Sequence, residues 1–226
     1  MPRARVPRWI ADLTPDERRL FGRLRTPARI QDFLETLPIN FESERKTCMS
    51  PRRVLETRSA HCLEGALLAA AALWFHGRPP ILLDLKADRR DVDHVVALFR
   101  VAGRWGAISK TNHAVLRYRD PVYRTPHELA MSYFHEYFGD DGRKTLVSHS
   151  APFDLSRRGG GWVTSSRNLW HLSYALDVSR HIPIAPRDAL RRLRRADPIE
   201  RRAGLLVAWR PPPARRLAHV GRRPPR

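Results

Sequence analysis

The sequence predicts an α+β fold in which one buried helix packs on a mainly antiparallel β-sheet. A long apolar segment, residues 60–76, has the length of a helix and is apolar nearly all round, so we expect it to be central. Three short apolar runs, rich in branched residues, follow it as expected strands: 81–85, 94–101 and 104–109. Ala102-Gly103 joins the last two runs and is short enough for a β-hairpin.

The helices that precede this core are predicted by their first residues. Thr26-Pro27 and Ser50-Pro51 each place a capping side chain before a proline at the first helical position. Apolar residues then repeat at helical spacing up to Pro38, which ends the first of these helices.

The second half of the chain gives weaker signals. A capping box at Thr125-x-x-Glu128 predicts a helix that Gly139 closes. The remaining expectations, in chain order, are a flexible loop at 156–162, a strand or helix at 169–178, a basic helix at 186–196, a final strand at 204–209 and a disordered Arg/Pro-rich tail.

Length and composition indicate one main domain. With 226 residues and 42% hydrophobic residues, the chain can bury an ordinary core. We expect a basic lead-in at 1–25, the folded domain at 26–185 and a basic segment at 186–226. No run approaches the ~18 apolar residues of a membrane span, and the N-terminus lacks the apolar stretch of a secretory signal. Two cysteines, Cys48 and Cys62, fit a reducing compartment, so a cytoplasmic location is expected.

The net charge of +19 is concentrated at the two ends of the chain. Residues 1–29 contain 8 Arg and 3 acidic residues, and residues 187–226 contain 13 Arg and 3 acidic residues. Such ends can contact nucleic acid or an acidic partner through a salt-sensitive attraction. No motif of a sequence-specific nucleic-acid reader occurs, so binding of this kind would be nonspecific. Abundant Arg, Pro and Ala are equally typical of a GC-rich genome.

Cys62 is the predicted reactive centre. It stands where the long apolar helix should begin, and the positive end of a helix favours the thiolate, which is the reactive form of cysteine. His94 opens the second expected strand and could exchange a proton with the thiol. A third group should hold the imidazole in one tautomer. Taken alone, Cys62 could instead be a small buried hydrophobic residue.

Residues 50–80 and 91–109 resemble the core of the transglutaminase-like superfamily, relatives of the papain-like cysteine enzymes. In that family a Cys begins the central helix, a His lies on the next major strand, and an Asp follows on the adjacent hairpin strand. The resemblance covers about residues 26–112 and assigns Cys62 as nucleophile and His94 as base. It implies a transglutaminase-like core and acyl transfer on an amide bond of a protein, peptide or small molecule, to water or to an amine.

The third position departs from the family pattern. Ser109 stands where the resemblance leads us to expect Asp, and Asn112 is the other candidate for orienting the His94 ring. A serine hydroxyl can accept the imidazole N–H but cannot stabilise imidazolium as a carboxylate does. The family also contains members that have lost activity and serve as binding or scaffolding modules, which is the alternative function.

Other chemically active residues are given lesser roles. We expect Cys48 to be structural, and His61 to point away from Cys62 as a surface or entrance residue. His113 follows the hairpin and could approach the site. No cofactor or metal is expected, because spacings such as CxxC, HxxxH and HExxH do not occur. The backbone N–H of Cys62 is one natural oxyanion donor.

Overall fold

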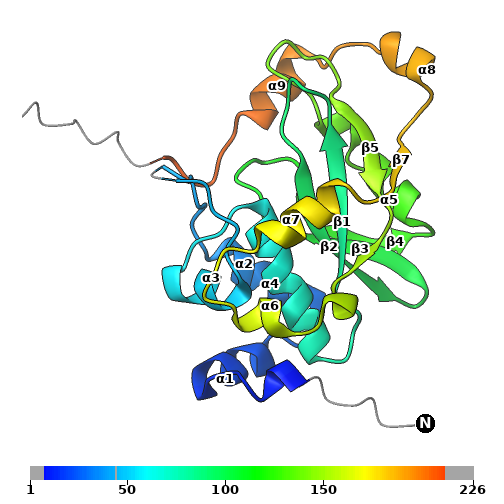
Figure 1. The fold of residues 1–226 in the computed structure, drawn as a ribbon. Helices are drawn as coiled ribbons and strands as arrows, with labels where there is room; N and C mark the ends of the chain where they lie inside the picture. Colours follow the sequence, from blue (N-terminus) through cyan, green and yellow to red (C-terminus); the bar gives the residue numbers. More distant parts are fainter. Residues whose placement is uncertain (1–7, 44, 212–226) are drawn as a thin grey trace, which may run out of the picture.

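The structure, a computed structural model, describes residues 8–43 and 45–211. It combines one antiparallel sheet with several helices, in agreement with the predicted α+β class (Figure 1). The strands are β1 (Ile81–Ala87), β2 (His94–Val101), β3 (Arg104–Ser109), β4 (Arg119–Tyr123), β5 (Leu146–Ser150), β6 (Phe153–Asp154) and β7 (His181–Pro183). They follow the order β4-β3-β2-β1-β5-β7, and β6 pairs with β1 outside this path.

The helices precede and follow the central strands. They are α1 (Pro15–Arg23), α2 (Pro27–Glu35), α3 (Pro51–Thr57), α4 (Cys62–Phe75), α5 (Pro126–Met131), α6 (Gly161–Thr164), α7 (Trp170–Asp177), α8 (Arg187–Arg191) and α9 (Pro198–Gly204). Thr26 and Ser50 cap α2 and α3 as predicted, each accepting a backbone N–H with its side chain. Short 3₁₀ turns lie at Arg8–Ile10, Phe134–Glu136 and Leu155–Arg158.

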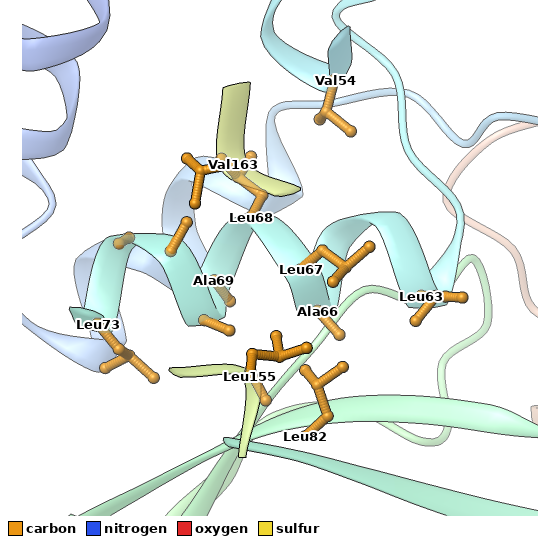
Figure 2. Packing of buried hydrophobic residues seen from close by; sticks show 14 of the residues in the cluster. Val54, Leu63, Ala66, Leu67, Leu68, Ala69, Leu73, Leu82, Leu155 and Val163 are labelled. Atoms are coloured by element: carbon orange, nitrogen blue, oxygen red, sulfur yellow. The ribbon is translucent and has the colours of Figure 1, made fainter. Parts of the chain in front are cut away.

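Helix α4 is the centre of the larger core, as its all-round apolar sequence predicted. Eleven of its 14 residues are buried. Figure 2 shows Leu68 beside Val163 on one side of α4, and Ala66 directed toward Leu155 and Leu82 on the other. Neighbouring elements therefore surround α4, which explains why it has no polar face.

The central strands are buried on both faces. Val95, Ala97 and Phe99 belong to the core around α4, whereas Val96 and Leu98 belong to a second core. The second core contains Leu129 of α5, Phe134 of the following 3₁₀ turn, and Tyr133 between them. Burial on both faces explains why these strands read as continuous apolar runs rather than as an alternating pattern.

Several expectations for the second half of the chain were wrong. The predicted strand at 204–209 is absent: the segment follows α9, and only an isolated bridge joins Val207 to His113. The predicted loop at 156–162 includes part of a 3₁₀ turn and the start of α6. Residues 169–178, expected as a strand or a helix, contain helix α7, which agrees with one of the two alternatives. The expected long helix from 126 divides into α5 and a 3₁₀ turn. Most of the tail predicted to be disordered, residues 212–226, lies outside the described residues.

Candidate functional site

The first turn of α4 lies against the residue that follows β3. Cys62 is the first residue of α4, as predicted, and Gly65 one turn on packs against Lys110. His94 begins β2 and Ser109 ends β3, and these neighbouring strands are antiparallel. The beginning of β2 and the end of β3 therefore lie at the same end of the sheet, close to the start of α4.

The strand register places His94 and Ser109 on one face of the sheet. Val96 lies opposite Ser109, and His94 is two residues before Val96 on the same face. The side chains meet: Nε2 of His94 lies 2.8 Å from Oγ of Ser109. Both residues are buried, so this hydrogen bond is shielded from water.

The partners of Ser109 fix the tautomer of His94. The Ser109 hydroxyl donates its hydrogen to the carbonyl of Leu116 at 2.5 Å. It has no second hydrogen, so it can only accept from His94, and Nε2 of the imidazole must carry the hydrogen. In the neutral ring, Nδ1 then has the free lone pair and is the basic atom.

Helix α2 holds Ser109 in place. The amide of Gln31 donates to the Ser109 carbonyl at 2.8 Å and accepts from the Ser109 N–H at 2.9 Å. Gln31 is itself buried. This two-point contact fixes the backbone that positions the hydroxyl beside His94.

Glu64 is a fully buried carboxylate in the first turn of α4. It accepts hydrogen bonds from the Asn40 side chain at 3.1 Å, the Thr47 hydroxyl at 2.7 Å and the Met49 N–H at 2.8 Å. The backbone N–H of His61 adds a fourth bond, at 3.1 Å. A buried carboxylate with this many donors forms a rigid support for the start of α4.

The position of His61 corrects our expectation. Its ring does not point away from the site: Nε2 lies 3.3 Å from Oε1 of Glu64 and 3.1 Å from the carbonyl of Thr47. The His61 ring also interacts with the Cys62 side chain, and this interaction raises the pKa of the imidazole and lowers the pKa of the thiol. Because the Thr47 carbonyl can only accept, Nε2 of His61 carries a hydrogen. Cys62 therefore has a histidine partner from its own helix start in addition to His94.

The pKa values of the two cysteines are shifted in opposite directions. Burial raises the pKa of Cys62, but hydrogen bonds and charge from His61 and His94 outweigh it and hold that pKa well below its ordinary value. Burial, together with the charge of Glu64, raises the pKa of Cys48 to about 12. These shifts favour the thiolate at Cys62 and the uncharged thiol at Cys48, which is a core residue, as its 0% exposure indicates.

Asn112 and His113, two other candidate residues, contact the C-terminal part of the chain. The side chain of Asn112 exchanges hydrogen bonds with the backbone of Trp209, at 2.8 and 3.0 Å. The His113 ring lies 2.8 Å from the carbonyl of Gly204 and is exposed. Both residues attach the segment after α9 to the loop after β3, and Ser109 is the one of the two predicted orienting residues that bonds His94.

An acidic cluster lies beside the start of β2. Within the described ranges, Asp84, Asp93 and Asp177 form a group close enough to share a cation. The Lys86 ammonium contacts both Asp93, at 2.8 Å, and Asp177, while Asp84 pairs with His181 at 3.1 Å. These contacts already supply positive charge to the cluster, and they connect α7 to the residue before His94.

Part of the C-terminal positive charge is paired within the fold. Arg194 lies 2.6 Å from Asp197, and Arg191 lies 3.9 Å from Asp188. Both pairs are exposed, so they contribute little to stability.

No helix in the described part of the chain is long and apolar enough to cross a membrane.

Comparison with protein-family models gives no match for this chain, and comparison with curated proteins gives none either.

Sequence reasoning missed the role of Glu64 and misplaced His61. Glu64 interrupts an otherwise apolar helix three residues after His61, which precedes the first helical residue. A Glu at this spacing is the acidic half of a capping box. This pattern could have indicated that Glu64 folds back toward His61 and remains beside Cys62.

Proposed function

We propose that this chain is a cysteine-dependent acyl-transfer enzyme with a transglutaminase-like, papain-like core, acting on an amide bond of a protein, peptide or small molecule. The observation that carries the proposal is the 2.8 Å hydrogen bond between His94 and Ser109. It leaves Nδ1 of His94 as the basic atom, while the His94 side chain interacts with a thiol that begins a buried helix. A base in a fixed tautomer beside an acidic thiol is the arrangement that nucleophilic catalysis requires.

The chemistry follows in two halves. In the first, the Cys62 thiolate attacks the carbonyl carbon, a C–S bond forms, and the backbone N–H of Cys62 is the donor to the oxyanion. Protonated His94 gives its proton to the leaving amine, the C–N bond breaks, and a thioester remains. In the second, neutral His94 takes a proton from water or an acceptor amine, which attacks the thioester. The C–S bond breaks and the thiolate returns.

An activated ester tests this proposal without knowledge of the natural substrate. Incubation with p-nitrophenyl acetate should acetylate Cys62, detected by peptide mass spectrometry, and release nitrophenolate in a burst. Cys62→Ala should abolish both signals. His94→Gln should slow the release of nitrophenolate after the burst by about a hundredfold, the scale of general acid–base catalysis, because nitrophenolate leaves without a proton whereas water needs a base to attack the thioester. Cys48→Ala is the matched control and should retain both.

The acceptor and the alternative function are outcomes of the same experiment. An excess of a primary amine that appears in an amide product would indicate transfer, and free acetate would indicate hydrolysis. A folded protein that leaves Cys62 unmodified would contradict the proposal and would fit the non-catalytic binding module. Binding to nucleic acid or an acidic partner through the Arg-rich ends would appear as an affinity that falls steeply with salt.

A further inference from the structure

Two histidines interact with the thiol of Cys62 and lower its pKa, and the other partners of these histidines differ in kind. His94 is bonded to Ser109, a neutral hydroxyl that cannot balance a positive charge. His61 is paired with Glu64, a carboxylate 3.3 Å from its Nε2. At the end of β3 the site has Ser109 in place of the expected carboxylate. A carboxylate is instead supplied by Glu64 in the first turn of α4, where it is paired with the second histidine.

The surroundings of His61 favour a retained positive charge. Its Nε2 faces the carbonyl of Thr47 at 3.1 Å, Glu64 at 3.3 Å and Glu42 at 3.9 Å. Glu64 has no exposed surface and is fixed by hydrogen bonds from three other residues, so its charge cannot turn away toward water. The titratable groups around the ring are thus two carboxylates and the Cys62 thiol, and all three favour the imidazolium.

The pKa of His61 is consistent with this geometry. Burial alone lowers it, but the hydrogen bond to Cys62 and the charges of Cys62 and Glu64 raise it to about 9. His61 is therefore protonated at neutral pH.

We propose that the two histidines divide the work at Cys62: His94 moves the proton, while His61, anchored by Glu64, stays protonated as the fixed counter-charge of the thiolate. This inference rests on the proposed function for the task of His94. During turnover the proton passes from His94 to the leaving amine and returns from the attacking water or amine, and His61 neither gains nor loses a proton. The fixed charge removes the need for a carboxylate next to His94.

The pH profile of Cys62 alkylation tests the division, because it requires no acyl donor. Iodoacetamide labelling of Cys62, followed by mass spectrometry from pH 4 to pH 10, reports thiolate formation. His61→Gln should raise the thiol pKa by at least one unit, so that labelling at pH 6 slows about tenfold or more. His94→Gln should slow labelling at pH 6 by less than His61→Gln does, while slowing the release of nitrophenolate after the burst by about a hundredfold. His113→Gln, at an exposed ring outside the site, is the matched control.

Two further measurements separate this role from a merely structural one. Cys62→Ser should lower the pKa of His61 from about 9 in NMR titrations of the ring, since the thiolate no longer contributes. Glu64→Gln should shift the alkylation profile in the same direction as His61→Gln, provided that circular dichroism shows a native fold.

The outcomes distinguish the two proposals. An alkylation profile that His61→Gln leaves unchanged in a folded protein would overturn the division of work, even if acyl-enzyme forms. A low thiol pKa that depends on His61, without any acyl-enzyme, would support the ion pair and contradict the proposed function.

Discussion

Ser109 accepts the Nε2 hydrogen of His94 at 2.8 Å and gives its own hydrogen to the carbonyl of Leu116. This relationship orients the imidazole without adding charge, which distinguishes it from a carboxylate–imidazole pair. Two hydrogen bonds between the Gln31 side chain and the Ser109 backbone fix the position of the hydroxyl. In the proposed division of work, Ser109 orients His94 and His61 supplies the positive charge beside the thiolate.

Ser109→Ala should slow hydrolysis of the Cys62 acyl-enzyme without preventing it. The variant removes one hydrogen bond, a contribution of about 1 kcal/mol, which corresponds to roughly a fivefold to tenfold change in rate. Ser109→Thr keeps the hydroxyl and should retain more activity. The rate of nitrophenolate release after the burst is the measurement, and Ser156→Ala, at an exposed serine, is the control. Equal rates for the Ala variant and the wild type would show that the hydroxyl does not orient His94.

Labelling at neutral pH should be confined to one of the two cysteines. The pKa of Cys62 is held well below its ordinary value, whereas burial and the charge of Glu64 raise that of Cys48 to about 12. Iodoacetamide at pH 7 should modify Cys62 in the native protein and reach Cys48 after unfolding in urea. Peptide mass spectrometry separates the two sites. Native labelling of Cys48 at a rate similar to that of Cys62 would contradict this assignment.

The central part of the fold could be predicted because local signals and tertiary structure agree there. β2 and β3 have the predicted bounds, and the turn between them has positive φ angles at Ala102 (47°) and Gly103 (77°), as a tight hairpin requires. Helix α4 begins at Cys62 because a buried all-apolar segment has a clear start. Beyond β3 the elements are short, and long-range pairings such as that of β5 with β1 leave little local signal.

The candidate site was only half predictable for a related reason. Cys62 and His94 lie at element boundaries that the apolar pattern marks. The interaction of His61 with Glu64 depends on the loop that supplies Asn40, Thr47 and Met49, and no local pattern places that loop over the start of α4.

Asp84→Asn should make the protein less sensitive to pH between about 4 and 6. Burial and the charge of Asp93 raise the pKa of Asp84 to about 6, above the unfolded value of about 3.9. The folded state therefore binds more protons than the unfolded state in this range, and stability falls as pH rises through it. The two-unit difference corresponds to a loss of about 2 to 3 kcal/mol.

Urea unfolding at pH 4 and at pH 7 measures this effect. The free energy of unfolding of Asp84→Asn, relative to that of the wild type, should be about 2 to 3 kcal/mol greater at pH 7 than at pH 4. Asp16→Asn, at an exposed carboxylate in α1, is the control and should show no such change. A relative stability of the Asp84 variant that does not depend on pH would contradict the raised pKa.

Gly65→Ala should destabilise the protein even though Gly65 lies inside helix α4. Alanine would favour the helix by about 1 kcal/mol, but a Cβ at this position would lie 2.4 Å from Cβ of Lys110. Lys110 is fixed because its ammonium donates to the carbonyls of Leu34 and Leu37, so overpacking should cost about 1 to 3 kcal/mol and outweigh the helical gain. Gly22→Ala in α1, with no atom within 4 Å of its Cβ, should be stabilising by about 0.5 to 1 kcal/mol. Urea unfolding of both variants measures the contrast, and equal stabilisation of the two would show that α4 does not pack against Lys110.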